Sequence, residues 1–428
     1  MDSRKLYEGF VKCLSHEATS CQDSLFRNLA DFLCADDGDI FIINGYAGTG
    51  KTTALSAVIT YLRRLGIKSV LMAPTGRAAK VLSIMSGRPA STVHKHIYRQ
   101  KSVGSNGYGQ FSLAPNKAVH TLFVVDEVSL IGMDTSQQQT SLFGSGNLLE
   151  DLVQFVRSGN DCRLILMGDS AQLPPVGLDA SPALSPEYME TFEGVRFSVL
   201  RTVVRQAVES PVLRNATLLR NIIEDASVDD CIESPGLEAE EGSGVERITG
   251  GRLLEALSDA YDRYGYDDTI VLCRSNKRAN RYNAGIRASV LYREERLSRG
   301  DKLMVVKNCY QFLEQVPELD FIANGDVARL VRLSRHEERY GLHFAEAVLA
   351  FPDYNDVEVT AKVVLDTLES EQPSLGSEQQ RALWQGVNED YADERNARKR
   401  YQKVREDPYY NALQIKYATA ITGHKSQG

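Results

Sequence analysis

Short apolar runs along the N-terminal half of the chain predict the strands of a sheet. The runs are residues 40–43, 70–73, 122–125 and 164–167. Helical stretches separate them, as in residues 53–65, where apolar side chains recur at the spacing of one helix face. Short strands that alternate with helices are typical of a parallel α/β sheet, whose functional side chains gather where the strands end. We therefore expect the polar residues that follow the four runs to form one site.

The first run leads into a glycine-rich loop, residues 45–52, which matches the pattern G-x-x-x-x-G-K-S/T. Strand, loop and helix in this order direct backbone N–H groups and a helix dipole at an anion. Lys51 is expected between the β- and γ-phosphates and Thr52 on Mg²⁺, whereas the alternative is a glycine-rich turn before an ordinary helix. The residues expected to bind the nucleotide here are Gly48, Thr49, Gly50, Lys51, Thr52 and Thr53.

Polar residues after the third and fourth runs predict the rest of a hydrolytic site. Asp126 is expected to hold Mg²⁺ through its water shell, and Glu127 to orient or deprotonate the attacking water. Gln172 is placed to hydrogen-bond the γ-phosphate or that water. A solvated strand end is the alternative for the two carboxylates. ATP and Mg²⁺ are the ligands that this set of residues predicts.

Two further polar positions are ambiguous from the sequence alone. Gln22 precedes the phosphate loop, and a carboxamide can pair with N6 and N7 of adenine together, although a solvated glutamine is the alternative. His94 and His96 are two residues apart without a third ligand nearby, which makes a poor metal site. Contact with a phosphate or a base is the better hypothesis for His94.

The remainder of the chain changes character several times. Residues 99–118 predict a small projecting hairpin, with a disordered polar loop as the alternative. Residues 221–246 hold nine carboxylates and no Lys or Arg, which favours an exposed linker. Residues 274–302 carry nine basic residues against three carboxylates, which fits either a nucleic-acid surface or a solvated helix face. Residues 301–365 are strand-like and predict a small β-barrel, and residues 377–405 predict charged helices.

Bulk composition narrows the class of protein. The net charge of −8 shows no overall basicity, but a local basic groove is sufficient for nucleic acid. Seven scattered cysteines with no C-x-x-C pair suggest a reducing compartment, with neither a disulfide framework nor a metal site. No apolar run approaches the length of a membrane span, so no membrane partner is expected. We expect a cytoplasmic or nucleoid protein, or an organellar or nuclear one in a eukaryote.

Taken together, the motifs resemble those of class B superfamily 1 helicases, specifically the PIF (petite integration frequency) branch and its RecD-like and phage Dda-like relatives. The segments that carry the resemblance are residues 45–52, 73–80, 91–98, 124–132, 166–177, 203–206 and 422–428. GDSAQLPPVG and TGHKSQG distinguish this group from other P-loop ATPases. LLEDLVQFVRSG, residues 148–159, occupies the place of a helical signature of the PIF branch.

The resemblance implies an α/β fold with two RecA-like domains and ATP between them. The first would be residues 1–190 with the hairpin insert, and the second residues 191–300 and 406–428. An SH3-like barrel with helices, residues 301–405, would be inserted in the second. A further motif with a second arginine that reaches the γ-phosphate is expected beyond Gly428.

The resemblance also assigns roles to residues. Lys51, Thr52, Asp126, Glu127 and Gln172 would act as described above, Gln22 would recognise adenine, and Arg205 would be an arginine finger from the second domain. Single-stranded DNA would contact Pro74, Thr75, His94, Pro175, Val176, Asn276, His424, Lys425 and Ser426.

The function so implied is an ATP-dependent helicase that moves 5′ to 3′ on single-stranded DNA, is monomeric in isolation and acts on forked or structured DNA. Two alternatives remain: the motor subunit of a DNA-repair nuclease complex, and a DNA-binding switch controlled by ATP without movement.

Overall fold

The 428-residue chain is described by a computed structural model that covers every residue except 1, 47, 104–108, 133–144, 176, 203–209, 225–235, 241, 310, 314–315, 317–318, 320 and 428. Its residues form two compact units, the first made mainly of residues up to Ile248 and the second mainly of residues from Thr249 onward. In the described part of the chain, no helix is both long and apolar enough to span a membrane.

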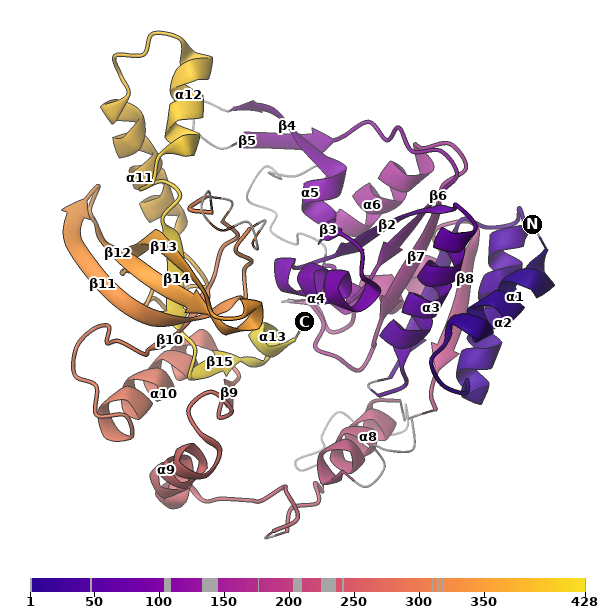
Figure 1. Cartoon of the computed structure of the whole chain (residues 1–428), viewed down its shortest axis with the longest axis horizontal. Coiled ribbons are helices and arrows are strands. Elements are labelled where there is room, and N and C mark those ends of the chain that lie inside the picture. Colours follow the sequence, from indigo (N-terminus) through magenta and orange to yellow (C-terminus); the bar gives the residue numbers. More distant parts are fainter. Residues whose placement is uncertain are drawn as a thin grey trace. The chain divides into compact units, whose positions relative to one another are not determined.

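The first unit is built on a parallel six-stranded sheet with the order β3-β2-β6-β7-β1-β8 (Figure 1). The strands are β1 (Ile40–Gly45), β2 (Lys68–Ala73), β3 (Ala90–Thr92), β6 (Thr121–Val125), β7 (Arg163–Gly168) and β8 (Val195–Leu200). The four apolar runs of the sequence are β1, β2, β6 and β7, and all four are inner strands. Both faces of the sheet are covered, which explains why these strands are continuously apolar rather than alternating.

Helices cover both faces of this sheet. The helices of the first unit are α1 (Ser3–Cys13), α2 (Ser20–Cys34), α3 (Lys51–Arg64), α4 (Gly76–Ser86), α5 (Val93–Ile97), α6 (Leu148–Arg157), α7 (Pro186–Met189) and α8 (Pro211–Glu224), and all but α8 lie on the sheet. Phe10, Phe26 and Val58 of α1, α2 and α3 pack on one face, with Phe41 of β1. Helices α5 and α6 pack on the other face, where Phe123 of β6 is buried. The short 3-10 turns η1 (Val128–Leu130) and η2 (Pro182–Leu184) complete that side.

A two-stranded hairpin, β4 (Tyr98–Val103) and β5 (Gly109–Leu113), projects from the chain after α5. The expected hairpin at residues 99–118 is therefore present. Strand β8 pairs with β1 along its whole length, from Ile40 opposite Val195 to Gly45 opposite Leu200. The first sheet thus extends beyond the expected boundary at residue 190, because β8 completes its edge.

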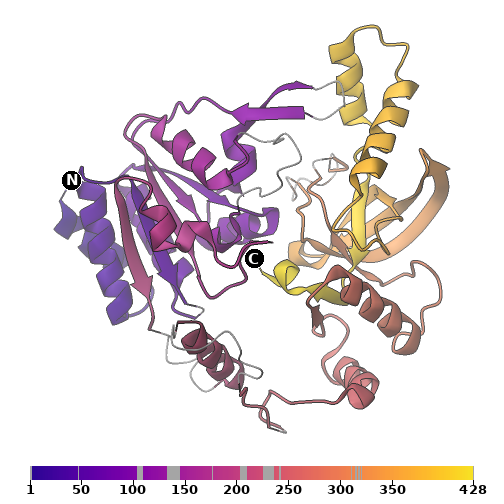
Figure 2. The same ribbon diagram turned by 180° about the vertical axis from the view of Figure 1, so that it is seen from behind.

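The second unit contains a closed five-stranded barrel (Figures 1 and 2). Its strands are β10 (Lys302–Val305), β11 (Val327–Arg339), β12 (Leu342–Phe351), β13 (Val357–Val364) and β14 (Leu413–Tyr417). Tyr340 and Gly341 join β11 to β12, both with positive φ (55° and 71°), which suits the right-handed twist of a tight hairpin. The predicted barrel is confirmed, but its fifth strand, β14, lies beyond residue 405 and closes the barrel by pairing with β10.

The second unit has further elements besides the barrel strands. They are η4 (Gly250–Arg252), α9 (Leu253–Tyr264), β9 (Val271–Cys273), α10 (Asn276–Ser289), η5 (Pro352–Tyr354), α11 (Ser377–Asp390), α12 (Ala397–Glu406), β15 (Ala420–Thr422) and α13 (Gly423–Ser426). In the part of this unit that the structure describes, the expected second α/β sheet is the parallel pair β9 and β15. The buried Asn283 of α10 ties it together, since its Nδ2 donates to the carbonyl of Ala420 at 2.8 Å and its Oδ1 accepts from the N–H of Ala420 at 2.7 Å.

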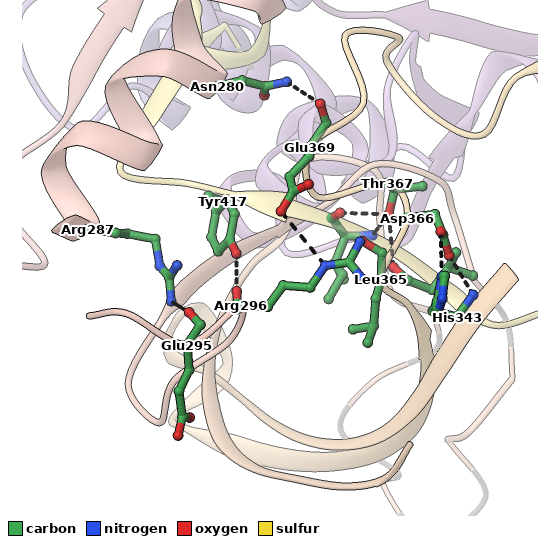
Figure 3. A network of polar contacts seen from close by, with 12 residues as sticks. Asn280, Arg287, Glu295, Arg296, His343, Leu365, Asp366, Thr367, Glu369 and Tyr417 are labelled. Carbon is green, nitrogen blue, oxygen red and sulfur yellow. Dashed lines mark hydrogen bonds and ion pairs between the residues drawn. The ribbon is translucent and has the colours of Figure 1, made fainter. Parts of the chain in front are cut away.

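Much of the basic stretch 274–302 is used inside the second unit. Arg287 donates to the carbonyl of Glu295 at 2.7 Å, and Arg296 donates to the carbonyl of Leu365 at 3.0 Å (Figure 3). Arg287 and Arg293 also bind the carboxylate of Asp301, which is 1% exposed. These three arginines therefore hold the barrel to the segment before it, so they are neither a solvated helix face nor a free basic surface.

Candidate functional site

The phosphate loop has the backbone that its glycines predict. Gly48 and Gly50 have φ of 75° and 74°, in the left-handed region that favours glycine. A Cβ at Gly45 would lie 2.7 Å from the Lys51 side chain, and a Cβ at Gly50 would lie 2.6 Å from Nε2 of Gln22. Helix α3 begins at Lys51 without a side-chain cap, so its first N–H groups are left for an anion.

Lys51 lies across the loop that precedes it. Its Nζ donates to the carbonyls of Gly45 at 2.6 Å and Tyr46 at 3.1 Å, and lies 3.9 Å from Oδ2 of Asp169. Burial lowers the pKa of Lys51, and the charges of Asp169 and the two carboxylates after β6 oppose that effect. The ammonium is thus the central cation of a largely buried acidic site.

The two carboxylates after β6 have different surroundings. Asp126 is 8% exposed, and burial, reinforced by the charge of Glu127, raises its pKa to about 7. Its Oδ1 accepts from the N–H of Glu127 at 2.8 Å. Glu127 has a φ of 55°, an uncommon backbone for a residue with a side chain, and such backbones concentrate at functional sites. Burial also raises the pKa of Glu127.

Gln172 lies beside these carboxylates. Its backbone N–H donates to the carbonyl of Asp169 at 3.1 Å, and its Oε1 accepts from Oγ of Ser129 at 3.2 Å. A hydrogen bond from its side chain lowers the pKa of Glu127, against the larger effect of burial. Asn44 of β1 is joined to Ser170 by two hydrogen bonds of 2.9 and 3.1 Å. The ends of β1, β6 and β7 therefore meet as expected, and they bring Lys51, Asp126, Glu127 and Gln172 into one site.

Gln22 has a different setting from either alternative of the sequence analysis. It is 0% exposed, so it is not a solvated surface residue. Its Oε1 accepts from the N–H of Thr19 at 3.1 Å within the cap of α2, and its Nε2 donates to the carbonyl of Thr49 at 3.2 Å. The side chain thus fastens α2 to the phosphate loop, and the adenine contact stays a prediction that this arrangement does not favour.

Two residues that were not predicted from the sequence complete the site. Asp169 is 1% exposed, and its Oδ2 accepts from Nη2 of Arg220 at 3.0 Å. The Arg220 guanidinium also lies over the ring of Tyr46, 4.0 Å from the ring centroid. Asp169 stood within a quoted motif, but no pattern in the sequence links position 220, on α8, to the phosphate loop.

The expected DNA contacts of the first unit are only partly exposed. Thr75 caps α4, where its Oγ1 accepts from the N–H of Ala78 at 3.1 Å. His94 follows β3 and so stands at the same sheet edge as Pro74 and Thr75, which follow β2. Burial lowers the pKa of His94, and the centroid of its ring lies 5.7 Å from that of Tyr98.

Other predicted residues of this group are buried or lie outside the described residues. Pro175 is buried, and a Cβ placed on Gly132 would lie 2.8 Å from the Cβ of Pro175. The Pro175 side chain is therefore covered by protein rather than open to DNA. His96 is partly buried and packs edge-on against Phe123 and Phe155, with ring centroids 5.9 and 5.8 Å apart. Val176 and the expected arginine finger Arg205 lie outside the described residues.

In the second unit, the expected DNA contacts gather at the ends of β9 and β15. Cys273 of β9 pairs with Thr422 of β15, so Asn276 and residues 423–426 follow the same end of the two strands. Asn276 and Lys425 line one small pocket. Nζ of Lys425 donates to Oδ1 of Asn324 at 2.6 Å, and burial lowers its pKa. Oγ of Ser426 donates to the carbonyl of Gly423 at 2.7 Å. His424 belongs to the same short helix, α13.

The residues of the first unit fit a nucleoside triphosphate with Mg²⁺. An uncapped helix start, a glycine backbone and Lys51 suit the phosphates, and Thr52 and Asp126 offer the oxygen ligands that Mg²⁺ prefers. In the described ranges, no cluster of three or more His, Cys, Asp or Glu residues could hold a metal.

Comparison with known proteins agrees with this site. Residues 25–227 match the protein family described as an AAA domain. The chain is 33% identical over 177 residues to the ATP-dependent RecD2 DNA helicase of Deinococcus radiodurans. This match covers 41% of this chain and 21% of that protein. The chain is also 24% identical over 300 residues to the ATP-dependent DNA helicase dda of Enterobacteria phage T4. This second match covers 68% of this chain and 62% of that protein.

The chain thus spans about a fifth of the RecD2 helicase and less than two thirds of the Dda helicase. Among solved structures, the crystal structure of the Pif1 helicase from Candida albicans is similar over 96% of this chain and 86% of that one, with 16% identity and a TM-score of 0.44. By sequence, residues 25–227 match an AAA domain, and the chain is similar to two proteins that are named as ATP-dependent DNA helicases.

Proposed function

We propose that the chain is an ATP-dependent DNA helicase that moves 5′ to 3′ along single-stranded DNA and separates duplex or structured DNA. The observation that carries this proposal is the convergence of Lys51, Asp126, Glu127 and Gln172 at the ends of neighbouring parallel strands. Two relatives whose names describe ATP-dependent DNA helicases support it.

In this proposal each residue has one task. Lys51 supplies a positive charge at the phosphates. Its partial burial strengthens the attraction between the ammonium and the phosphates, because less water screens it. Glu127 accepts the proton of the attacking water, and its raised pKa makes it a stronger base than an exposed glutamate. Gln172 keeps Glu127 in place through their side-chain contact. When bound, Mg²⁺ neutralises phosphate charge, and Thr52 and Asp126 are the residues that would hold it.

Movement requires that hydrolysis alter the grip on DNA. A conformational change can be driven only if ATP binds one state of the protein better than another. Residues after β2 and β3 in the first unit, and after β9 and β15 in the second, are the proposed DNA contacts. Phosphate contacts and base stacking would hold the strand without recognising its sequence. Arg205 stays the proposed arginine finger.

The proposal is tested with forked DNA that carries either a 5′ or a 3′ single-stranded tail. We expect unwinding of the 5′-tailed fork only, together with an ATPase that single-stranded DNA stimulates. A requirement for the 3′ tail would overturn the direction. An ATPase that single strands do not stimulate would favour the DNA-binding switch, and co-purification of a nuclease would favour the motor-subunit alternative.

A further inference from the structure

Arg220 of α8 occupies a buried position beside the phosphate loop. Its side chain is 6% exposed, and Nη2 donates to Oδ2 of Asp169 at 3.0 Å. The guanidinium covers the ring of Tyr46, with Cζ 4.0 Å from the ring centroid. Among the residues that the structure describes, its buried Nε has no hydrogen-bond partner. One side chain of α8 therefore contacts both the loop and the residue that follows β7.

Asp169 lies between two cations that share one of its oxygens. Oδ2 is 3.0 Å from Nη2 of Arg220 and 3.9 Å from Nζ of Lys51, while Oδ1 accepts from the N–H of Ala171 at 3.0 Å. A carboxylate that is 1% exposed requires a close ionic partner, because removal of that partner leaves an uncompensated buried charge. Arg220 fills this role at hydrogen-bonding distance, whereas Lys51 stays at a longer distance and bonds to the carbonyls of Gly45 and Tyr46.

We propose that Arg220 is a positioning residue of the ATP-hydrolysing site. It neutralises Asp169, which leaves the Lys51 ammonium available to the triphosphate, and it steadies the loop through Tyr46. This inference rests on the proposed function, since it concerns how Lys51 is presented to ATP. Without Arg220, Asp169 would draw Lys51 into a close ion pair, and the lysine would have to leave that pair before it could bind phosphate.

Two other residues of α8, Asn215 and Arg214, bond to the segment that follows the helix rather than to the phosphate loop. Asn215, one and a half turns before Arg220, exchanges two hydrogen bonds of 2.8 Å with the backbone of Glu238. Arg214 of the same helix pairs with the side chain of Glu238 at 2.9 Å and is about half exposed. Arg214 is therefore a matched control: an arginine on the same helix, paired with a carboxylate, away from the phosphate loop.

The experiment compares Arg220→Gln, Asp169→Asn, the double variant and Arg214→Gln with the unaltered chain. Binding of a fluorescent, non-hydrolysable ATP analogue and steady-state ATPase are both measured. We expect Arg220→Gln to weaken analogue binding by about tenfold or more, the scale on which residues that orient a binding group act. In the Asp169→Asn background the same substitution should change binding by no more than about twofold, because the competing charge is gone. Arg214→Gln should bind as the unaltered chain does.

Arg220→Lys keeps the charge but not the planar stack, so we expect it to recover part of the loss. An equal effect of Arg220→Gln in both backgrounds would mean a structural role alone and would overturn the inference. Binding by Arg220→Gln that matches the unaltered chain would also overturn it. Failure of the unaltered chain itself to bind the analogue would instead overturn the proposed function, so the two failures are distinct.

Discussion

Gln22 is bonded through Nε2 to the carbonyl of Thr49 at 3.2 Å, so the start of α2 is joined to the phosphate loop by a completely buried carboxamide. The phosphate loop is therefore held in part by α2, a helix that lies before β1 in the chain. A Cβ at Gly50 would meet the same Nε2 at 2.6 Å, so a side chain there would have to displace the Gln22 carboxamide.

Substitution of Gln22 by Ala should lower the free energy of unfolding. It leaves the partly buried N–H of Thr19 and the buried carbonyl of Thr49 without their partner, and an unsatisfied buried group costs about 1–3 kcal/mol. Urea unfolding measures the loss, and Gln154→Ala, at an exposed position of α6, is the control. A change below about 0.5 kcal/mol, as is usual at the surface, would show that this carboxamide is not a structural link.

Substitution of Lys51 by Ala should abolish ATP hydrolysis while some affinity for single-stranded DNA remains. The reason is that Lys51 is the cation presented by the phosphate loop, whereas the proposed DNA contacts follow other strands. ATPase assays and DNA-binding titrations check both parts, with Lys68→Ala at the exposed start of β2 as the control. Duplex unwinding by the Lys51→Ala variant would refute the assignment of this site.

Substitution of Glu127 by Gln should lower the ATPase rate by about 10²- to 10⁴-fold, the usual contribution of a positioned base, while nucleotide binding is kept. Burial raises the pKa of Glu127. The ATPase rate of the unaltered chain should therefore rise with pH and level off at a higher pH than it would with an ordinary glutamate as the base. That rise should vanish in the variant. Persistence of the same pH profile in Glu127→Gln would assign the base to another group.

Substitution of Asp126 by Asn should stabilise the chain at alkaline pH when nucleotide and Mg²⁺ are left out. Its pKa is about 7 in the folded protein against 3.8 in the reference state, so the folded state binds the extra proton between these values. Stability therefore falls as pH rises through that window, by about 1.4 kcal/mol per pH unit from this group.

Thermal unfolding at pH 5 and pH 8 measures the effect. The fall between the two pH values should be smaller in Asp126→Asn than in the unaltered chain, and Asp179→Asn, at an exposed position, should leave it unchanged. An equal fall in Asp126→Asn would mean that the carboxyl is already ionised in the folded protein at pH 5.

Substitution of Lys425 by Gln should weaken binding of single-stranded DNA uniformly across sequences. Each phosphate contact of a single strand contributes about 0.7 to the slope of log affinity against log salt, so loss of one contact should reduce the slope by about that amount. Binding at several salt concentrations measures it, with Lys12→Gln on α1 as the control. An unchanged slope would show that Lys425, which is held by Asn324, supports α13 rather than DNA.

Prediction from the sequence was most successful where a signal is local. The four apolar runs became neighbouring inner strands, and residues 45–52 took the expected strand, loop and helix form, because burial on two faces and left-handed glycines both leave a mark over a few residues. The barrel was also foreseen from consecutive strands. Its closure by β14 was not, because pairing across a long insertion leaves no short-range pattern.

The sequence by itself determined the phosphate loop, the carboxylates after β6 and the α/β character of the chain, since each depends on residue types at fixed short spacings. Only the tertiary structure decided that Gln22 is a buried link, that Pro175 is covered, and that Arg220 reaches Asp169 from 51 residues away. These outcomes depend on which distant surfaces pack together and which charges burial forces into pairs, and neither quantity can be obtained from spacing along the chain.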